Sequence, residues 1–260
     1  MNFSNSSIKA TIVIVSILFV AGGTLVYASH SWGGYHWART SNPFTLNMGD
    51  NVSSAWDAYL GEASSDWSAS AVLDTRVVRG GTTPKNCRAT NGRVEVCGSK
   101  YGFNGWLGVA SIWVSGSHIT KSTVKVNDSY FNTATYNTPS WRRLVMCQEI
   151  GHTFGLDHQD ENFSNSNLGT CMDYTSNPNG PLSNEHPNAH DYEQLEATYA
   201  HLDSTTTVRQ VISNRFGNNN EADANEWGKK ARKDSRDKTS VYVRDLGNND
   251  KLFTFVLWAD

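Results

Sequence analysis

Residues 147–174, CQEIGHTFGLDHQDENFSNSNLGTCMDY, decide the fold of this chain. Within this stretch, positions 148 and 152 differ by about 40° of net rotation on a helix, so their side chains share one face. The spacing of five residues predicts such a helix followed by a tight turn: Gln148, Glu149, His152, Gly155 and His158.

This spacing is suited to binding a metal ion. Side chains on one helix face can bind the same ion, and Glu149 beside them can reach a water molecule bound to it. Gly155 permits the left-handed conformation that ends a helix, so the chain can turn back and bring His158 to the ion. Gln148, His152 and His158 would then leave a fourth position open, which is typical of a catalytic metal site.

The pattern resembles the signature H-E-x-x-H-x-x-G-x-x-H of the metzincin clan of zinc metalloproteases, with Gln148 in place of the first histidine. That clan carries a methionine-containing tight turn downstream of the third ligand, and residues 170–174 (TCMDY), with Met172, match it. The resemblance covers roughly residues 35–203. It implies an α+β, zincin-like fold with a mixed twisted sheet, an active-site helix and a methionine turn.

By this resemblance, the chain is expected to be a zinc-dependent endopeptidase that acts on peptides or proteins. Zn²⁺ would be held by Gln148, His152 and His158, and Glu149 would accept a proton from the metal-activated water. Tyr174 matches a tyrosine that approaches the metal in the astacin branch. It would stabilise the oxyanion, and a buried structural tyrosine is the alternative.

The glutamine leaves two functional hypotheses open. An amide oxygen is a weaker zinc ligand than imidazole, so Gln148 is expected to lower zinc affinity. A neutral oxygen also donates less charge, so any zinc retained would still acidify its water, and the presence of Glu149 favours activity. The alternative is a catalytically weak or inactive pseudoprotease that binds proteins or glycans on the same fold.

A substrate-binding strand is expected upstream of the helix. Residues 106–114 (WLGVASIWV) and 118–126 (HITKSTVKV) predict two strands joined by a turn. In the metzincin pattern, an antiparallel edge strand precedes the active-site helix and pairs with the substrate backbone, whereas the alternative is an ordinary sheet strand. By that resemblance, four residues bind peptide by strand addition: Leu107, Gly108, Val109 and Ala110.

Other elements follow from capping residues and periodicity. Thr138 and Pro139 are typical of an N-cap and a first helical turn, so they place the start of the active-site helix just before Trp141. Periodicity predicts the remaining elements of this region: helices over residues 51–67 and 189–201, and strands over residues 71–78 and near residues 94–96.

The four cysteines predict two disulfides if the protein is exported. Residues 91–92 (Asn-Gly) are a hairpin signal between Cys87 and Cys97, so these two cysteines are expected to face each other. Cys147 and Cys171 remain, and their bond would join the active-site helix to the methionine turn. Zinc ligation by cysteine is the alternative, but Cys147 lies about 140° around the helix from the metal-binding face.

The N-terminal segment predicts export. Residues 1–28 contain Lys9, an apolar run and a small-residue end at Ala28, as expected for a signal peptide whose cleavage yields a secreted protein without stable membrane association. The alternative is an uncleaved membrane anchor, because apolar character persists over residues 10–28.

The rest of the chain divides into two parts. Residues 29–203 are expected to form the metalloprotease domain, and residues 204–260 a polar linker followed by a hairpin. A lone hairpin is marginally stable in water, so it is expected to dock on the main domain or on a partner. The net charge of -3 gives no reason to expect nucleic acid as a partner. The sequence leaves the oligomeric state and the cleavage specificity open.

Overall fold

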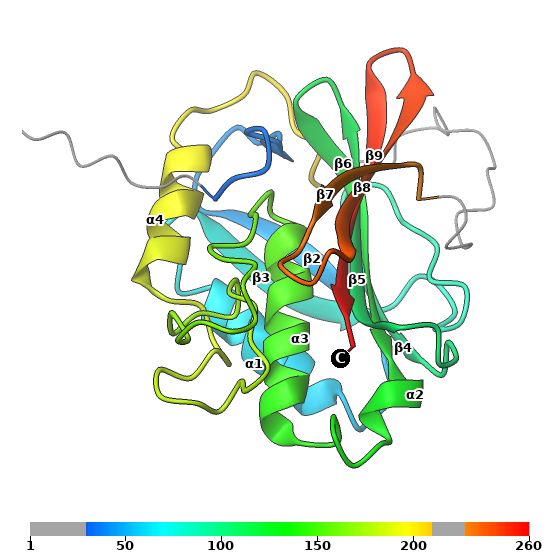
Figure 1. The fold of residues 1–260 in the computed structure, drawn as a ribbon. Coiled ribbons are helices and arrows are strands. Elements are labelled where there is room, and N and C mark those ends of the chain that lie inside the picture. Colours follow the sequence, from blue (N-terminus) through cyan, green and yellow to red (C-terminus); the bar gives the residue numbers. More distant parts are fainter. Residues whose placement is uncertain (1–29, 210–226, 260) are drawn as a thin grey trace, which may run out of the picture.

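The computed structural model describes residues 30–209 and 227–259 (Figure 1). These residues form an α+β fold around one mixed sheet. The expected signal peptide and residues 210–226 of the expected polar linker lie outside the described residues. Within the described ranges, no helix is both long and apolar enough to cross a bilayer.

The sheet has a parallel half and an antiparallel half. Its strands run in the order β3-β2-β4-β6-β5-β9-β8-β7, and β1 pairs with the start of β6. Strands β1 to β4 and β6 are mutually parallel, whereas β5, β9, β8 and β7 pair with their neighbours in antiparallel fashion. The strand bounds are β1 (His36–Trp37), β2 (Phe44–Asn51), β3 (Leu73–Arg79), β4 (Val94–Ser99), β5 (Trp106–Ser115), β6 (His118–Asn127), β7 (Lys229–Lys233), β8 (Thr239–Gly247) and β9 (Asp250–Trp258).

Four helices are present in the described part of the chain: α1 (Asp57–Trp67), α2 (Asp128–Phe131), α3 (Pro139–His152) and α4 (Ala189–Thr198). Helix α3 lies across one face of the sheet and contacts β5, β6 and β9, while α1 packs beside it (Figure 1). The start of α3 is as predicted, because the Thr138 side chain accepts a hydrogen bond from the backbone amide of Trp141.

Two local expectations were wrong. The helix expected over residues 51–67 begins only at Asp57, because Asn51 ends β2, a strand that the sequence analysis did not predict. The hairpin expected at residues 91–92 is also absent. The residues before this turn form no strand, and β4 pairs in parallel with β2 and β6 instead. Cys87 and Cys97 are nevertheless joined by a disulfide.

The C-terminal hairpin docks on the main sheet, as expected, and β7 adds a third strand to it. Strand β9 pairs with β5 along its length, with Val109 opposite Val256 and Ala110 opposite Phe255. The prediction that residues 107–110 form an exposed edge is therefore wrong for this structure. The reason is that the apolar β9 supplies hydrogen-bond partners for the backbone groups that a free edge would expose.

Candidate metal centre

The end of α3 and the turn after it bring two histidines together. Gly155 has φ of +90°, and a Cβ there would lie 2.0 Å from the carbonyl oxygen of Tyr35, so only glycine fits. The turn returns the chain toward the last residue of α3. As a result, Nε2 of His152 lies 2.9 Å from Nε2 of His158.

The outer nitrogens of both rings are already engaged. Nδ1 of His152 donates to the carbonyl oxygen of Leu156 at 2.9 Å, and Nδ1 of His158 lies 2.7 Å from a carboxylate oxygen of Glu161. With a proton on each Nδ1, both neutral rings direct Nε2 lone pairs at each other. Both side chains are buried. A cation that binds both Nε2 lone pairs would stabilise this arrangement, and the Nδ1 contacts are of the kind that orient metal-binding histidines.

Two further polar side chains on α3 lack partners for their oxygens. Gln148 is fully buried, and its Nε2 donates to the carbonyl oxygen of Cys171 at 2.8 Å. Its Oε1 has no hydrogen-bond partner among the described residues, and neither have the two carboxylate oxygens of buried Glu149. Unpartnered buried oxygens are costly, so this cluster fits a site completed by a metal ion and water.

The environment of Glu149 favours its protonated form. Burial raises the pKa of Glu149 well above its ordinary value. The nearby backbone amide of Ala110 lowers this pKa only in part, because it makes no well-formed hydrogen bond with the carboxylate. Gly108 of β5 allows this close packing, because a Cβ at that position would lie 2.4 Å from Oε1 of Glu149. The expected substrate-binding strand therefore does lie against the expected base.

The expected methionine turn lies directly beneath α3. A Cβ at Gly151 would lie 2.5 Å from the sulfur of Met172, so this glycine lets the methionine approach the helix. Tyr174 is buried, with its ring centroid 4.3 Å from that of His158. Burial raises the pKa of Tyr174 well above its ordinary value, so its hydroxyl keeps its proton and donates toward the carbonyl oxygen of Val256 at 3.5 Å.

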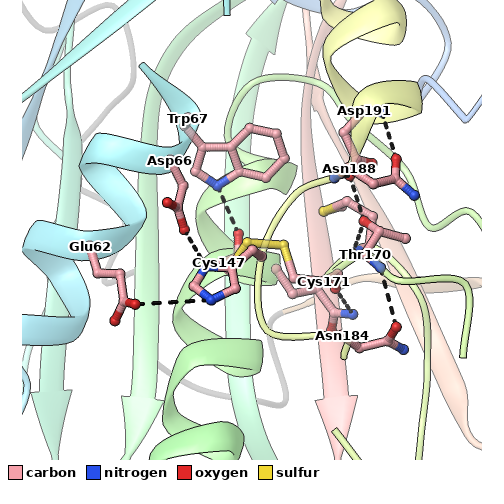
Figure 2. Close-up of a disulfide and its surroundings, with 12 residues drawn as sticks. Glu62, Asp66, Trp67, Cys147, Thr170, Cys171, Asn184, Asn188 and Asp191 are labelled. Carbon is pink, nitrogen blue, oxygen red and sulfur yellow. Dashed lines mark hydrogen bonds and ion pairs between the residues drawn. A yellow bond between two sulfur atoms is a disulfide. The ribbon is translucent and has the colours of Figure 1, made fainter. Parts of the chain in front are cut away.

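A disulfide joins the turn to the helix, as predicted. Figure 2 shows the bond between Cys147 of α3 and Cys171, next to Trp67 of α1. The indole of Trp67 donates to the carbonyl oxygen of Cys147 at 3.2 Å. On the other side, Thr170 donates to a carboxylate oxygen of Asp191 in α4. The segment that carries Met172 is thus held by α3 and α4, while α1 is hydrogen-bonded to α3 beside the disulfide.

The C-terminal strands cover the centre. The ring of Phe255 in β9 stacks on His152, with centroids 4.3 Å apart and planes 8° from parallel. Arg232 in β7 forms ion pairs with Asp157 and Glu161, which flank His158 in the sequence. The sequence alone did not predict that Phe255 and Arg232 lie at this centre. The marginal stability of a lone hairpin indicated that the last strands dock, but it contained no information on where they dock.

Two groups of side chains in the described ranges bring three ligand atoms within 4.8 Å of one another. One group, Asp157, His158 and Glu161, adjoins the centre, but Arg232 already forms ion pairs with both of its carboxylates. The other group contains His36, His201 and Asp203 and lies outside the segments described above.

No protein-family model and no curated protein matches this sequence. The solved structures that are similar to parts of the chain include the following three. One structure of myroilysin has 12% identity and a TM-score of 0.39, covering 66% of this chain and 98% of its own. A second has 12% identity and a TM-score of 0.35, covering 63% and 86%. High choriolytic enzyme 1, a hatching-enzyme zinc protease from the medaka fish Oryzias latipes, has 13% identity and a TM-score of 0.36, covering 64% and 94%. These values are low, so the functional argument depends on the geometry of the centre.

Proposed function

We propose that this chain is a secreted zinc-dependent endopeptidase whose described conformation is a closed form. The observation that carries the proposal is the pair of Nε2 atoms of His152 and His158, which face each other at 2.9 Å. The unpartnered oxygens of Gln148 and Glu149 belong to the preceding turn of the same helix as His152. Two imidazoles and an amide oxygen are three donors, which would leave the fourth position of a tetrahedral zinc site for water.

Each residue has a definite role in this proposal. The Cys171 carbonyl anchors the amide nitrogen of Gln148, which leaves Oε1 as the atom to bind the metal beside His152 and His158. These residues would hold Zn²⁺, whose Lewis acidity would acidify water for attack on a peptide carbonyl. Glu149 would accept the proton, a role suited to a carboxylate whose pKa burial raises well above its ordinary value. Tyr174 keeps its proton and serves as a hydrogen-bond donor.

The position of β9 suggests how substrate would bind. Residues 107–110 pair with β9 in the antiparallel manner that strand addition of a peptide requires. A peptide substrate would therefore displace β9 and take its place on β5. Because Phe255 leaves with β9, the same movement would uncover His152.

Export is supported by the two disulfides, Cys87–Cys97 and Cys147–Cys171. Disulfides persist in oxidising compartments and are rare in the cytosol. The proposed signal peptide would supply the route, and the cysteines leave no free thiol in the described part of the chain.

A non-catalytic binding protein on the same fold is the second candidate. It is favoured by one observation, the full burial of Gln148 and Glu149 behind β9. The two candidates differ in what they predict for a variant whose centre has been opened, because only the enzyme gains hydrolysis.

The variant Glu149→Gln tests the enzyme proposal. It should lower hydrolysis of an unfolded protein substrate by about 100-fold to 10,000-fold, the usual contribution of a general base, while zinc content stays unchanged. Zinc is measured by elemental analysis. Hydrolysis is measured for the full-length Glu149→Gln variant and for the double variant with Phe255→Ala, because Phe255→Ala is expected to open the centre.

Glu95→Gln is the matched control, because Glu95 is equally buried but pairs with Arg93 away from the centre. It should leave hydrolysis unchanged. Hydrolysis that survives Glu149→Gln would show that another residue accepts the proton. A chain that binds no zinc at this centre and stays inactive after opening would support the binding protein instead.

The variant Gln148→His should tighten zinc binding. An imidazole here can donate one N–H to the carbonyl oxygen of Cys171, as Gln148 does now, and direct its other nitrogen toward the metal. We expect zinc affinity to rise roughly tenfold or more, which is comparable to the change in metal affinity when a hydrogen-bond partner of a metal-binding histidine is replaced. Competition with a chelator measures the dissociation constant. Equal constants for the variant and the wild type would mean that position 148 does not bind the metal.

A further inference from the structure

A second group of histidines meets at one carboxylate and does not include any residue of the α3 motif. His36 belongs to β1, His118 begins β6, and His201 and Asp203 follow α4. Nε2 of His118 lies 3.1 Å from Oδ1 of Asp203, Nε2 of His36 lies 3.5 Å from it, and Nε2 of His201 lies 3.8 Å from it. Three imidazoles therefore direct the same ring nitrogen at one oxygen atom.

The carboxylate is held so that this oxygen faces the rings. Oδ2 of Asp203 accepts hydrogen bonds from Nη1 of Arg39 at 2.9 Å and from the Arg39 backbone amide at 3.2 Å. The Arg39 side chain is buried and also donates to the carbonyl oxygens of Tyr199 and His201. Because Arg39 occupies Oδ2, Oδ1 is left for the imidazoles.

The innermost ring is oriented as a metal ligand would be. Nδ1 of His36 donates to the carbonyl oxygen of Gly34 at 2.8 Å, so its neutral ring has the lone pair on Nε2. That Nε2 lies 3.1 Å from Nε2 of His201. Hydrogen bonds can satisfy these rings, because Nε2–H of His118 can donate to Oδ1 of Asp203 and Nε2–H of His201 can donate to Nε2 of His36. The same four atoms would also suit a metal ion, which would take the Nε2 lone pairs in place of these hydrogen bonds.

We propose that His36, His201 and Asp203 bind a transition-metal ion, with His118 as the fourth ligand. Imidazole nitrogens and one carboxylate oxygen are a set that suits Zn²⁺, and four protein ligands are typical of a structural site. The ion would join β1, the start of β6 and the segment after α4, which are far apart in the sequence. His36 is buried whereas the His201 side chain is 56% exposed, so the site opens to solvent on one side, which lets the ion enter.

The test compares zinc content and thermal stability in three full-length proteins. Wild type, His201→Ala and His186→Ala are each equilibrated with zinc and dialysed before elemental analysis. His186 is a matched control, because its side chain is 46% exposed and pairs with Asp66 near α1. We expect His201→Ala to bind one zinc ion fewer than the other two proteins, whether or not the α3 centre also binds zinc.

Thermal melts test the same site without reference to the α3 centre, because the zinc-induced shift is compared between proteins that share that centre. Zinc at about 100 times its dissociation constant should raise the melting temperature of wild type and of His186→Ala by about 5 °C or more beyond that of His201→Ala. In the presence of a chelator, wild type and His201→Ala should melt at similar temperatures, which shows that the variant is folded. The variant His118→Ala should weaken zinc binding as well. Equal zinc content and equal zinc-induced shifts in wild type, His201→Ala and His118→Ala would overturn the proposal.

Discussion

Replacing Phe255 with alanine is expected to raise peptide hydrolysis roughly 100-fold. Phe255 is fully buried and stacks on His152, and these contacts are lost when β9 leaves β5. Truncating a buried phenylalanine removes about 3 kcal/mol or more of stabilisation, which favours the open form by about two powers of ten. Initial rates on an unfolded protein substrate, compared with wild type at equal zinc loading, measure the effect.

Two comparisons separate opening from general destabilisation. Phe131 is equally buried but packs on Trp56, away from the candidate metal centre, so Phe131→Ala should destabilise the fold without raising hydrolysis. Adding Glu149→Gln to Phe255→Ala should remove the gained activity, because the gain depends on the same centre. Equal rates for Phe255→Ala, Phe131→Ala and wild type would mean that β9 does not control access.

A covalent lock should have the opposite effect. Ser111 of β5 and Thr254 of β9 are directly opposite, and their hydroxyl oxygens lie 3.3 Å apart. Opposite residues of antiparallel strands have Cα separations that fit a disulfide. The double variant Ser111→Cys/Thr254→Cys should therefore hold β9 on β5 and abolish hydrolysis, whereas each single variant keeps the wild-type rate. A locked protein that still cleaves substrate would show that peptides reach the centre by another route.

Removing the Cys147–Cys171 disulfide is expected to lower the free energy of unfolding by about 3 kcal/mol. The two cysteines are 24 positions apart, and closing a loop of that length constrains the unfolded chain by roughly this amount. The double variant Cys147→Ala/Cys171→Ala should also weaken zinc binding, because the Cys171 carbonyl that anchors Gln148 loses its covalent link to α3. Denaturant unfolding and chelator competition measure the two effects.

The other disulfide is the natural control. Cys87 and Cys97 are 10 positions apart and lie outside the candidate metal centre, so their removal should cost somewhat less stability and leave zinc affinity unchanged. If both double variants lose zinc affinity equally, the loss reflects general destabilisation. If neither does, the Cys147–Cys171 bond does not support the centre.

By itself, the sequence determined the local features of the α3 region. The start of the helix, the left-handed turn at Gly155 and the meeting of His152 with His158 depend on helical period, capping and glycine conformation. These are properties of neighbouring residues, so spacing alone was sufficient to predict them. The pairing of the four cysteines was also predicted correctly, although the hairpin that suggested it is absent.

Only the tertiary structure decided which surfaces are free and which distant residues meet. The sequence predicted that β9 would form and that its hairpin would dock, but it could not show that β9 covers residues 107–110. His36 and His201 are separated by 165 positions, and no period or cap links them. Their meeting depends on how β1 and the end of α4 pack around Tyr199, which accepts from the backbone amide of Trp37. Contacts of this kind arise from the packing of the whole domain, so local sequence patterns do not predict them.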